Sequence, residues 1–134
     1  METYLRDTSQ KLVKIQIQAG VVGIAETRVF LRYPGKNFKR ILKSESFSGG
    51  NIPLSKVDVN NNLLNATLRI NTSISLENIP NEHRKAAVKT ILMIDTLVGG
   101  PEGSKSFMSK ESEILVDNPT DPLHVEITKR IRLI

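Results

Sequence analysis

The chain has 134 residues, of which 39% are hydrophobic, so it can form one domain with a buried core. It has no cysteine, which excludes disulfides, thiolate metal sites and cysteine nucleophiles. The formal net charge is +5, and a positive balance favours anionic partners such as nucleic acid. The first residues lack the apolar run of a signal peptide, and no segment has the ~18 consecutive apolar residues of a membrane span. We therefore expect a single domain over residues 1–134 and no membrane partner.

The first half of the chain alternates between apolar and polar residues. This period of two indicates β-strands, because successive strand side chains point to opposite faces. It predicts strands at 11–19, 26–33, 38–47 and 52–59. Proline and glycine at 34 and 35 favour a tight turn, so the second and third of these strands should form an antiparallel hairpin.

The longest alternating run covers residues 63–77 and predicts a long strand. One parity is largely apolar. The other carries asparagine, threonine, serine and Arg69, with no carboxylate before Glu77. A polar face that is neutral to basic suits a broad open sheet that meets an anionic partner.

The spacing of apolar residues changes after Pro80. Clusters three to four residues apart predict helices over 82–98 and 104–115, with Asn81 as a possible N-cap of the first. The many β-branched residues in 82–98 would also suit a buried strand. In that alternative, two strands at 86–98 and 105–116 are joined by a hairpin at 99–103.

Alternation returns at 123–133 and predicts a closing strand with a basic outer end. The complete order predicts an α+β fold. We expect an antiparallel meander sheet of about five to six strands within 11–77, followed by two helices and a final C-terminal strand.

Little in the sequence supports an enzyme. The only histidines are His83 and His124, and no phosphate loop, nucleophile elbow or metalloprotease motif is present. Asp117 and Asp121 flank prolines, where a role in turn formation is the simpler explanation. We expect no catalytic residue, no cofactor, no metal and no small-molecule substrate, although a small enzyme of unrecognised type stays a third possibility.

A nucleic-acid-binding face has better support. Several basic and hydrogen-bonding residues share one parity within their strands, so a single sheet surface could carry many of them. Arginine and lysine hold phosphates, and asparagine and threonine reach base edges or 2′-hydroxyls. The candidate RNA-binding residues are Arg28, Arg32, Arg40, Lys43, Asn65, Thr67, Arg69 and Asn71. The alternative is that these residues simply solvate the outer face of a half-buried sheet.

The order of strands followed by two helices, in a basic cysteine-free chain of this length, resembles the coat proteins of single-stranded RNA bacteriophages. The resemblance is carried by 65–74, which reads NATLRINTSI, and by 81–92, which reads NEHRKAAVKTIL, followed by a glycine and proline break and a shorter second helix. The strand at 123–133 departs from the family arrangement. The resemblance covers about two-thirds of the chain and is one of pattern and order.

The resemblance implies an intertwined dimer, a shell built from many dimers, and a sheet face that binds a genomic RNA hairpin through Thr67, Arg69 and Asn71. It also implies a virion protein that assembles in the bacterial cytoplasm. An open sheet edge invites pairing across a two-fold axis, which independently favours a homodimer. The alternative, from a different functional class, is an all-β sandwich interaction module or a subunit of a larger bacterial or phage-tail-like assembly without RNA binding.

Overall fold

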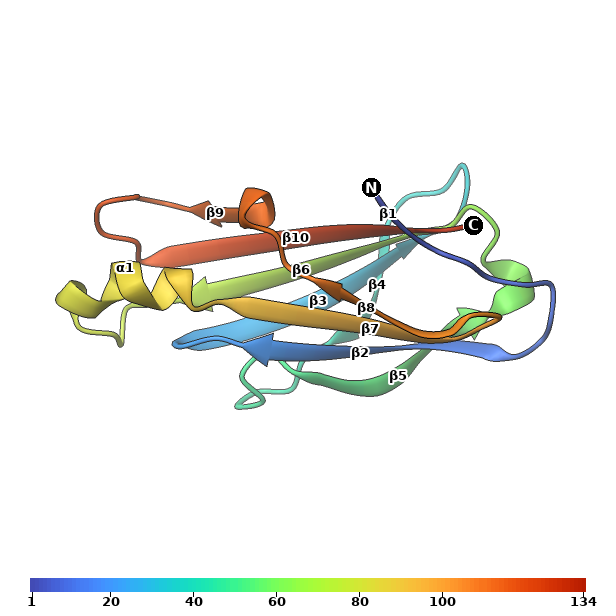
Figure 1. Ribbon diagram of the computed structural model, residues 1–134, viewed down its shortest axis with the longest axis horizontal. Coiled ribbons are helices and arrows are strands. Elements are labelled where there is room, and N and C mark those ends of the chain that lie inside the picture. The colour runs from blue at the N-terminus through green and yellow to red at the C-terminus, as the bar shows by residue number, and fades with distance from the viewer.

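The computed structural model describes all 134 residues as two β-sheets that enclose one hydrophobic core (Figure 1). Sheet A contains, in spatial order, β1 (Glu2–Tyr4), β10 (His124–Leu133), β6 (Thr67–Ser75), β3 (Ile24–Arg32) and β4 (Lys39–Lys43), with β9 (Ile114–Val116) also paired to β10. Sheet B contains β5 (Ile52–Val59), β2 (Leu12–Gly20), β7 (Leu92–Gly100) and β8 (Gly103–Met108).

Neighbouring strands are antiparallel except at one edge of sheet A. There β1 pairs in parallel with the end of β10, with Glu2 opposite Ile131, while β9 pairs with the beginning of β10, with Val116 opposite Val125. The two short strands therefore share one edge of β10. Figure 1 shows β1 and the end of β10 side by side.

The alternating sequence forms the core because every second side chain of a strand points between the sheets. On β10 the buried apolar residues are Val125, Ile127, Ile131 and Leu133. On β2, in the opposite sheet, they are Val13, Ile15 and Ile17. The core is almost entirely aliphatic, with Tyr4 and Phe107 as its buried aromatic residues.

Helical structure is confined to three short segments. The helix α1 (Asn81–Lys89) connects β6 of sheet A to β7 of sheet B, at the left end of Figure 1. The 3₁₀ turns η1 (Asn60–Asn62) and η2 (Glu111–Glu113) follow β5 and β8. No helix has the length and hydrophobicity needed to cross a membrane.

The predicted α+β fold is wrong. The chain has ten strands in two sheets and a single α-helix, instead of one meander sheet followed by two helices. The predicted helix over 82–98 ends at Lys89, and the predicted helix over 104–115 is absent. The alternative with a strand hairpin around Gly99–Gly103 describes this region better, because β7 and β8 pair with Gly100 opposite Gly103.

Composition explains where the helix ends. Residues 82–89 are rich in glutamate, arginine, lysine and alanine, which are good helix formers. Ile91, Ile94, Thr96 and Val98 are β-branched and lose side-chain freedom in a helix. Because β7 lies between β2 and β8, its backbone also forms hydrogen bonds along both edges. These bonds satisfy its N–H and C=O groups as fully as a helix would.

The strand predictions hold more closely. The structure has strands at 12–20, 24–32, 39–43, 52–59 and 124–133, each overlapping its predicted range. The long run at 63–77 contains a shorter strand, the nine-residue β6. A turn comes before it, in which Asn65 has a positive φ of 59°. The hairpin of β3 and β4 closes with a hydrogen bond from the Lys36 N–H to the Tyr33 carbonyl, 3.0 Å long.

Candidate nucleic-acid interface

The outer face of sheet A carries basic side chains in three adjacent rows across β10, β6, β3 and β4. We call this surface the basic face. The first row holds Arg132, Thr67 and Arg32; the second holds Arg130, Arg69, Phe30 and Arg40; the third holds Thr128, Asn71, Arg28 and Lys43. The first carboxylates on this face are Glu126 and Glu26, in the next row along the strands.

Arg69 lies at the centre of the basic face. Its guanidinium carbon is 4.5 Å from the ring centroids of both Phe30 and Phe38, and Arg32 lies 4.6 Å above the Phe38 ring. Cation–π contacts of this kind hold arginines in place while their charge stays available. The buried Nε of Arg69 has no hydrogen-bond partner in the protein.

Most of the positive charge on the basic face is not neutralised. Arg32, Arg40, Arg69, Arg130 and Arg132 form no ion pair. The exceptions lie at the boundary with the acidic row, where Glu26 contacts Arg28 at 2.7 Å and Lys43 at 3.6 Å. Residues that merely solvated the sheet would be expected to mix the two signs. A concentration of unpaired cations instead favours a polyanionic partner.

One end of the basic face is hollowed. This hollow, which we call the Arg32 hollow, has a volume of about 430 Å³ and lies where the β3–β4 turn meets the first row. Its lining includes Arg32, Lys36, Asn65, Thr67 and Arg132, and contains no aspartate or glutamate.

The structure brings the predicted RNA-binding residues together on one side of sheet A. Arg28, Arg32, Arg40 and Lys43 are exposed there, and Arg69 and Asn71 are half-buried. The Asn71 amide donates to the Thr128 hydroxyl at 2.8 Å. Thr67 points to the same face but is only 4% exposed, and Asn65 lies in the turn before β6 and lines the Arg32 hollow.

Six further residues belong to this surface and were not among the sequence-based candidates. They are Phe30, Lys36, Phe38, Thr128, Arg130 and Arg132. The signal for the two arginines was present, because both alternate with the buried Ile131 and Leu133 on the last strand. The signal for Lys36 was absent, because residues in a turn have no strand parity.

Neither histidine lies in a catalytic arrangement. His83 is well exposed, and its nearest acidic partner, Glu82, is 4.0 Å away. His124 contacts Asp117 at 3.4 Å, and backbone hydrogen bonding by His124 lowers the pKa of the Asp117 carboxyl. No group of three or more histidine, aspartate or glutamate side chains could hold a metal ion.

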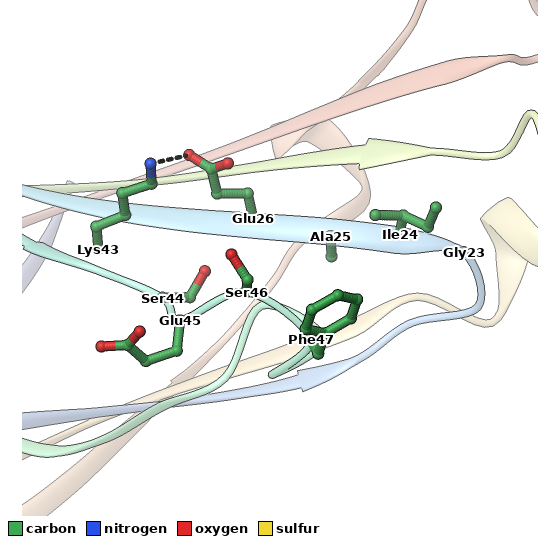
Figure 2. Close-up of a pocket in the computed structure, with 10 residues that line it drawn as sticks. Gly23, Ile24, Ala25, Glu26, Lys43, Ser44, Glu45, Ser46 and Phe47 are labelled. Carbon is green, nitrogen blue, oxygen red and sulfur yellow. Dashed lines mark ion pairs between the residues drawn. The ribbon is translucent and has the colours of Figure 1, made fainter.

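The largest pocket lies at the other end of β3, beside the acidic row. This groove, which we call the Phe47 groove, has a volume of about 520 Å³. It is bounded by the beginning of β3, Gly23 to Glu26, and by the loop from Lys43 to Gly49. Figure 2 shows the Phe47 ring on the loop, facing the strand near Ile24 and Ala25. The Phe47 side chain is fully exposed, and its backbone has a φ of 67°.

Comparison of the chain with models of known protein families, with characterised proteins and with solved structures finds no match. Functional inference therefore rests on the geometry of these surfaces.

Proposed function

We propose that the protein binds RNA and holds the phosphate backbone against the basic face of sheet A. The observation that carries this proposal is the set of five arginines without carboxylate partners in the first two rows. Each can bond a phosphate through two parallel N–H groups. Asn71 and Thr128 lie beside them in the third row and offer hydrogen bonds suited to 2′-hydroxyls.

The expected mode of binding is electrostatic. Phe30 and Phe38 are already covered by Arg69, so the surface does not present a row of free rings for stacking successive bases. Counterion release should therefore dominate the affinity, which should fall steeply with salt.

Fluorescence anisotropy with a labelled single-stranded RNA and a labelled RNA hairpin tests the proposal. The variant Arg130→Ala/Arg132→Ala removes two exposed, unpaired charges from the basic face. Its affinity should fall at least tenfold, and the salt slope should shrink by about 1.4, because each phosphate contact contributes about 0.7 on a single strand.

The matched control is Lys14→Ala/Lys56→Ala. These lysines face each other across β2 and β5 and also form no ion pair, so the variant removes the same charge from sheet B. The control should change RNA affinity less than twofold. Equal losses in both variants would mean that net charge alone attracts RNA. If neither RNA binds at 50 mM salt, the proposal is overturned. If duplex DNA binds more tightly than RNA, the basic face is a DNA-binding surface instead.

Self-assembly through dimers into a shell stays a prediction from the resemblance to phage coat proteins. Two helices of each subunit cannot hold such a dimer together, because the chain has one nine-residue helix. Electron microscopy of the purified protein is the direct measurement. Particles of tens of nanometres that contain RNA would support assembly, and isolated monomers would remove it.

A second candidate function is peptide binding in the Phe47 groove. The pairing of β4 with β3 ends where the Ser44 N–H donates to the Thr27 carbonyl at 2.8 Å. Main-chain groups two residues apart on a strand point the same way, so Ala25 presents its N–H and C=O to the groove. An extended peptide from a partner protein could add there as a strand, with an apolar side chain against Phe47 and Ile24.

A capped pentapeptide, Lys-Val-Thr-Val-Lys, is a suitable probe of this groove. Titration should shift the Ala25 amide signal in nitrogen-15 NMR spectra, and Phe47→Ser should weaken the effect. A peptide with proline at its centre lacks one ladder N–H and serves as the control. Shifts that are absent at millimolar peptide, or that occur at another edge, would exclude this candidate.

A further inference from the structure

The Arg32 hollow differs from the rest of the basic face in being concave and in gathering three cations. Arg32 comes from the end of β3, Lys36 from the β3–β4 turn and Arg132 from the end of β10. None of the three forms an ion pair, and no carboxylate lines the hollow. A small anion placed there would have a positively charged side chain on each of three sides.

The hollow also holds one of its cations in place and includes neutral polar residues. Arg32 is held over the Phe38 ring at 4.6 Å. Asn65 and Thr67 line the same space, and Thr67 lies between Arg32 and Arg132 in the register of the sheet. Because Arg32 is already placed, little of its side-chain freedom is lost when an anion binds.

The number of cations favours a terminal phosphate over a backbone phosphate. A phosphodiester carries one negative charge, whereas a phosphomonoester carries about 1.5 to 2 and has three acceptor oxygens. The hollow also lies at the end of the basic face, where the β3–β4 turn bounds the first row. A strand of RNA lying across the rows toward the turn would end there.

We infer that the Arg32 hollow binds the terminal phosphomonoester of an RNA strand, an inference that rests on the proposed RNA binding of the basic face. The hollow would give the protein a preference for phosphorylated ends, in addition to the general affinity of the rows for the backbone. One additional charge-assisted hydrogen bond to the terminal phosphate should give a preference of roughly tenfold or more.

The test compares one 12-nucleotide RNA in three forms, with hydroxyls at both ends, with a 5′-phosphate and with a 3′-phosphate. Anisotropy at 150 mM salt should show one phosphorylated form binding about tenfold more tightly than the hydroxyl form. Lys36→Ala/Arg132→Ala should abolish this preference, so that all three forms bind with the same affinity. That shared affinity should be lower than the parent's for the hydroxyl form, because Arg132 also belongs to the first row of the basic face. Arg40→Ala/Arg130→Ala, outside the hollow, should weaken all three forms equally and serves as the matched control.

The outcomes separate this inference from the proposed function. If all three forms bind equally well, the inference fails and RNA binding stands. If no form binds, the proposed function fails. If no phosphorylated form is preferred, inorganic phosphate is titrated while the NMR signals of Asn65 and Thr67 are followed. Shifts of these signals would show that the hollow takes a free anion instead of an RNA end, which would also overturn the inference. Circular dichroism checks that each variant folds.

Discussion

Lys129 on β10 donates its ammonium group to the carboxylate of Glu113 in η2 at 2.9 Å, although the lysine side chain is only 3% exposed. The lysine occupies a core-facing position of β10, between Ile127 and Ile131, and also donates to the Met108 carbonyl at 2.8 Å. A charge in this position is stable only while its partners stay in place. The pair therefore ties η2 and β8 to the centre of sheet A.

Lys129→Met is expected to lower the free energy of unfolding by about 3 kcal/mol. It removes the donor to the Met108 carbonyl and leaves the Glu113 carboxylate with the Lys110 N–H but no cation. Urea denaturation measures the loss. Lys129→Met/Glu113→Gln should lose less than the sum of the two single variants, because the removed charges depend on each other. Additive losses would show that the ion pair contributes nothing of its own.

Asp95 on β7 faces the same interior as Lys129, across a small cavity that both residues line. Burial raises the pKa of Asp95 to about 7, although the nearby Lys129 charge acts to lower this pKa. The Oδ1 of Asp95 has no hydrogen-bond partner. The folded protein therefore holds one more proton than the unfolded chain between about pH 4 and pH 7. The free energy of unfolding should fall as the pH rises through this interval and should stay low above it.

Asp95→Asn removes this titration. The variant should be more stable than the parent above pH 7, by a few kcal/mol at most, and the two should converge toward pH 4. Urea midpoints measured from pH 4 to pH 8 test this. A parent protein whose stability rises between pH 5 and pH 7, with the increase lost in Asp95→Asn, would show that Asp95 is ionised and paired in the folded state.

This interior cluster shows where sequence patterns stop being informative. Lys129 falls on the apolar parity of the last strand, so a charged residue at that position was already unusual. Asp95 was predicted to lie in a helix over 82–98, however, and a helical Asp95 has no reason to meet Lys129. The cluster exists only because residues 92–100 form a strand of sheet B, which faces Lys129 on sheet A. That strand depends on pairing with β2 and β8.

The basic face was more accessible from the sequence, because strand parity is a local property. Arg28 and Arg32 share a parity on β3, and Arg69 and Asn71 share one on β6. The register that aligns the two strands is a tertiary property and could not be predicted. Arg40 and Lys43 illustrate this, because their odd spacing fits one face only through the irregularity in the β3–β4 ladder near Val29 and Phe30.

Tyr4 connects β1 to the turn between β7 and β8 on the opposite sheet. Its buried hydroxyl donates to the Gly103 carbonyl at 2.6 Å and accepts from the Gly100 N–H at 2.8 Å. Tyr4→Phe leaves both backbone groups without this partner and should lower the free energy of unfolding by about 1–3 kcal/mol. Tyr33→Phe is the control, because that hydroxyl is bonded at the surface, and it should lose less than about 1 kcal/mol. Equal losses would mean that the Tyr4 bonds do not hold the two sheets together.

Arg69 should combine a role in RNA affinity with a modest role in packing. Arg69→Ala removes the central charge of the basic face and uncovers the rings of Phe30 and Phe38. RNA binding should weaken about fivefold or more, and stability should fall by about 1 kcal/mol, the usual size of a partly exposed cation–π contact. Arg69→Lys keeps the charge but loses the planar stacking, so it should recover part of the affinity. Anisotropy and urea denaturation on the three proteins separate the two effects. Unfolding of Arg69→Ala would mean that Arg69 is primarily structural, and unchanged RNA affinity in a folded variant would remove it from the interface.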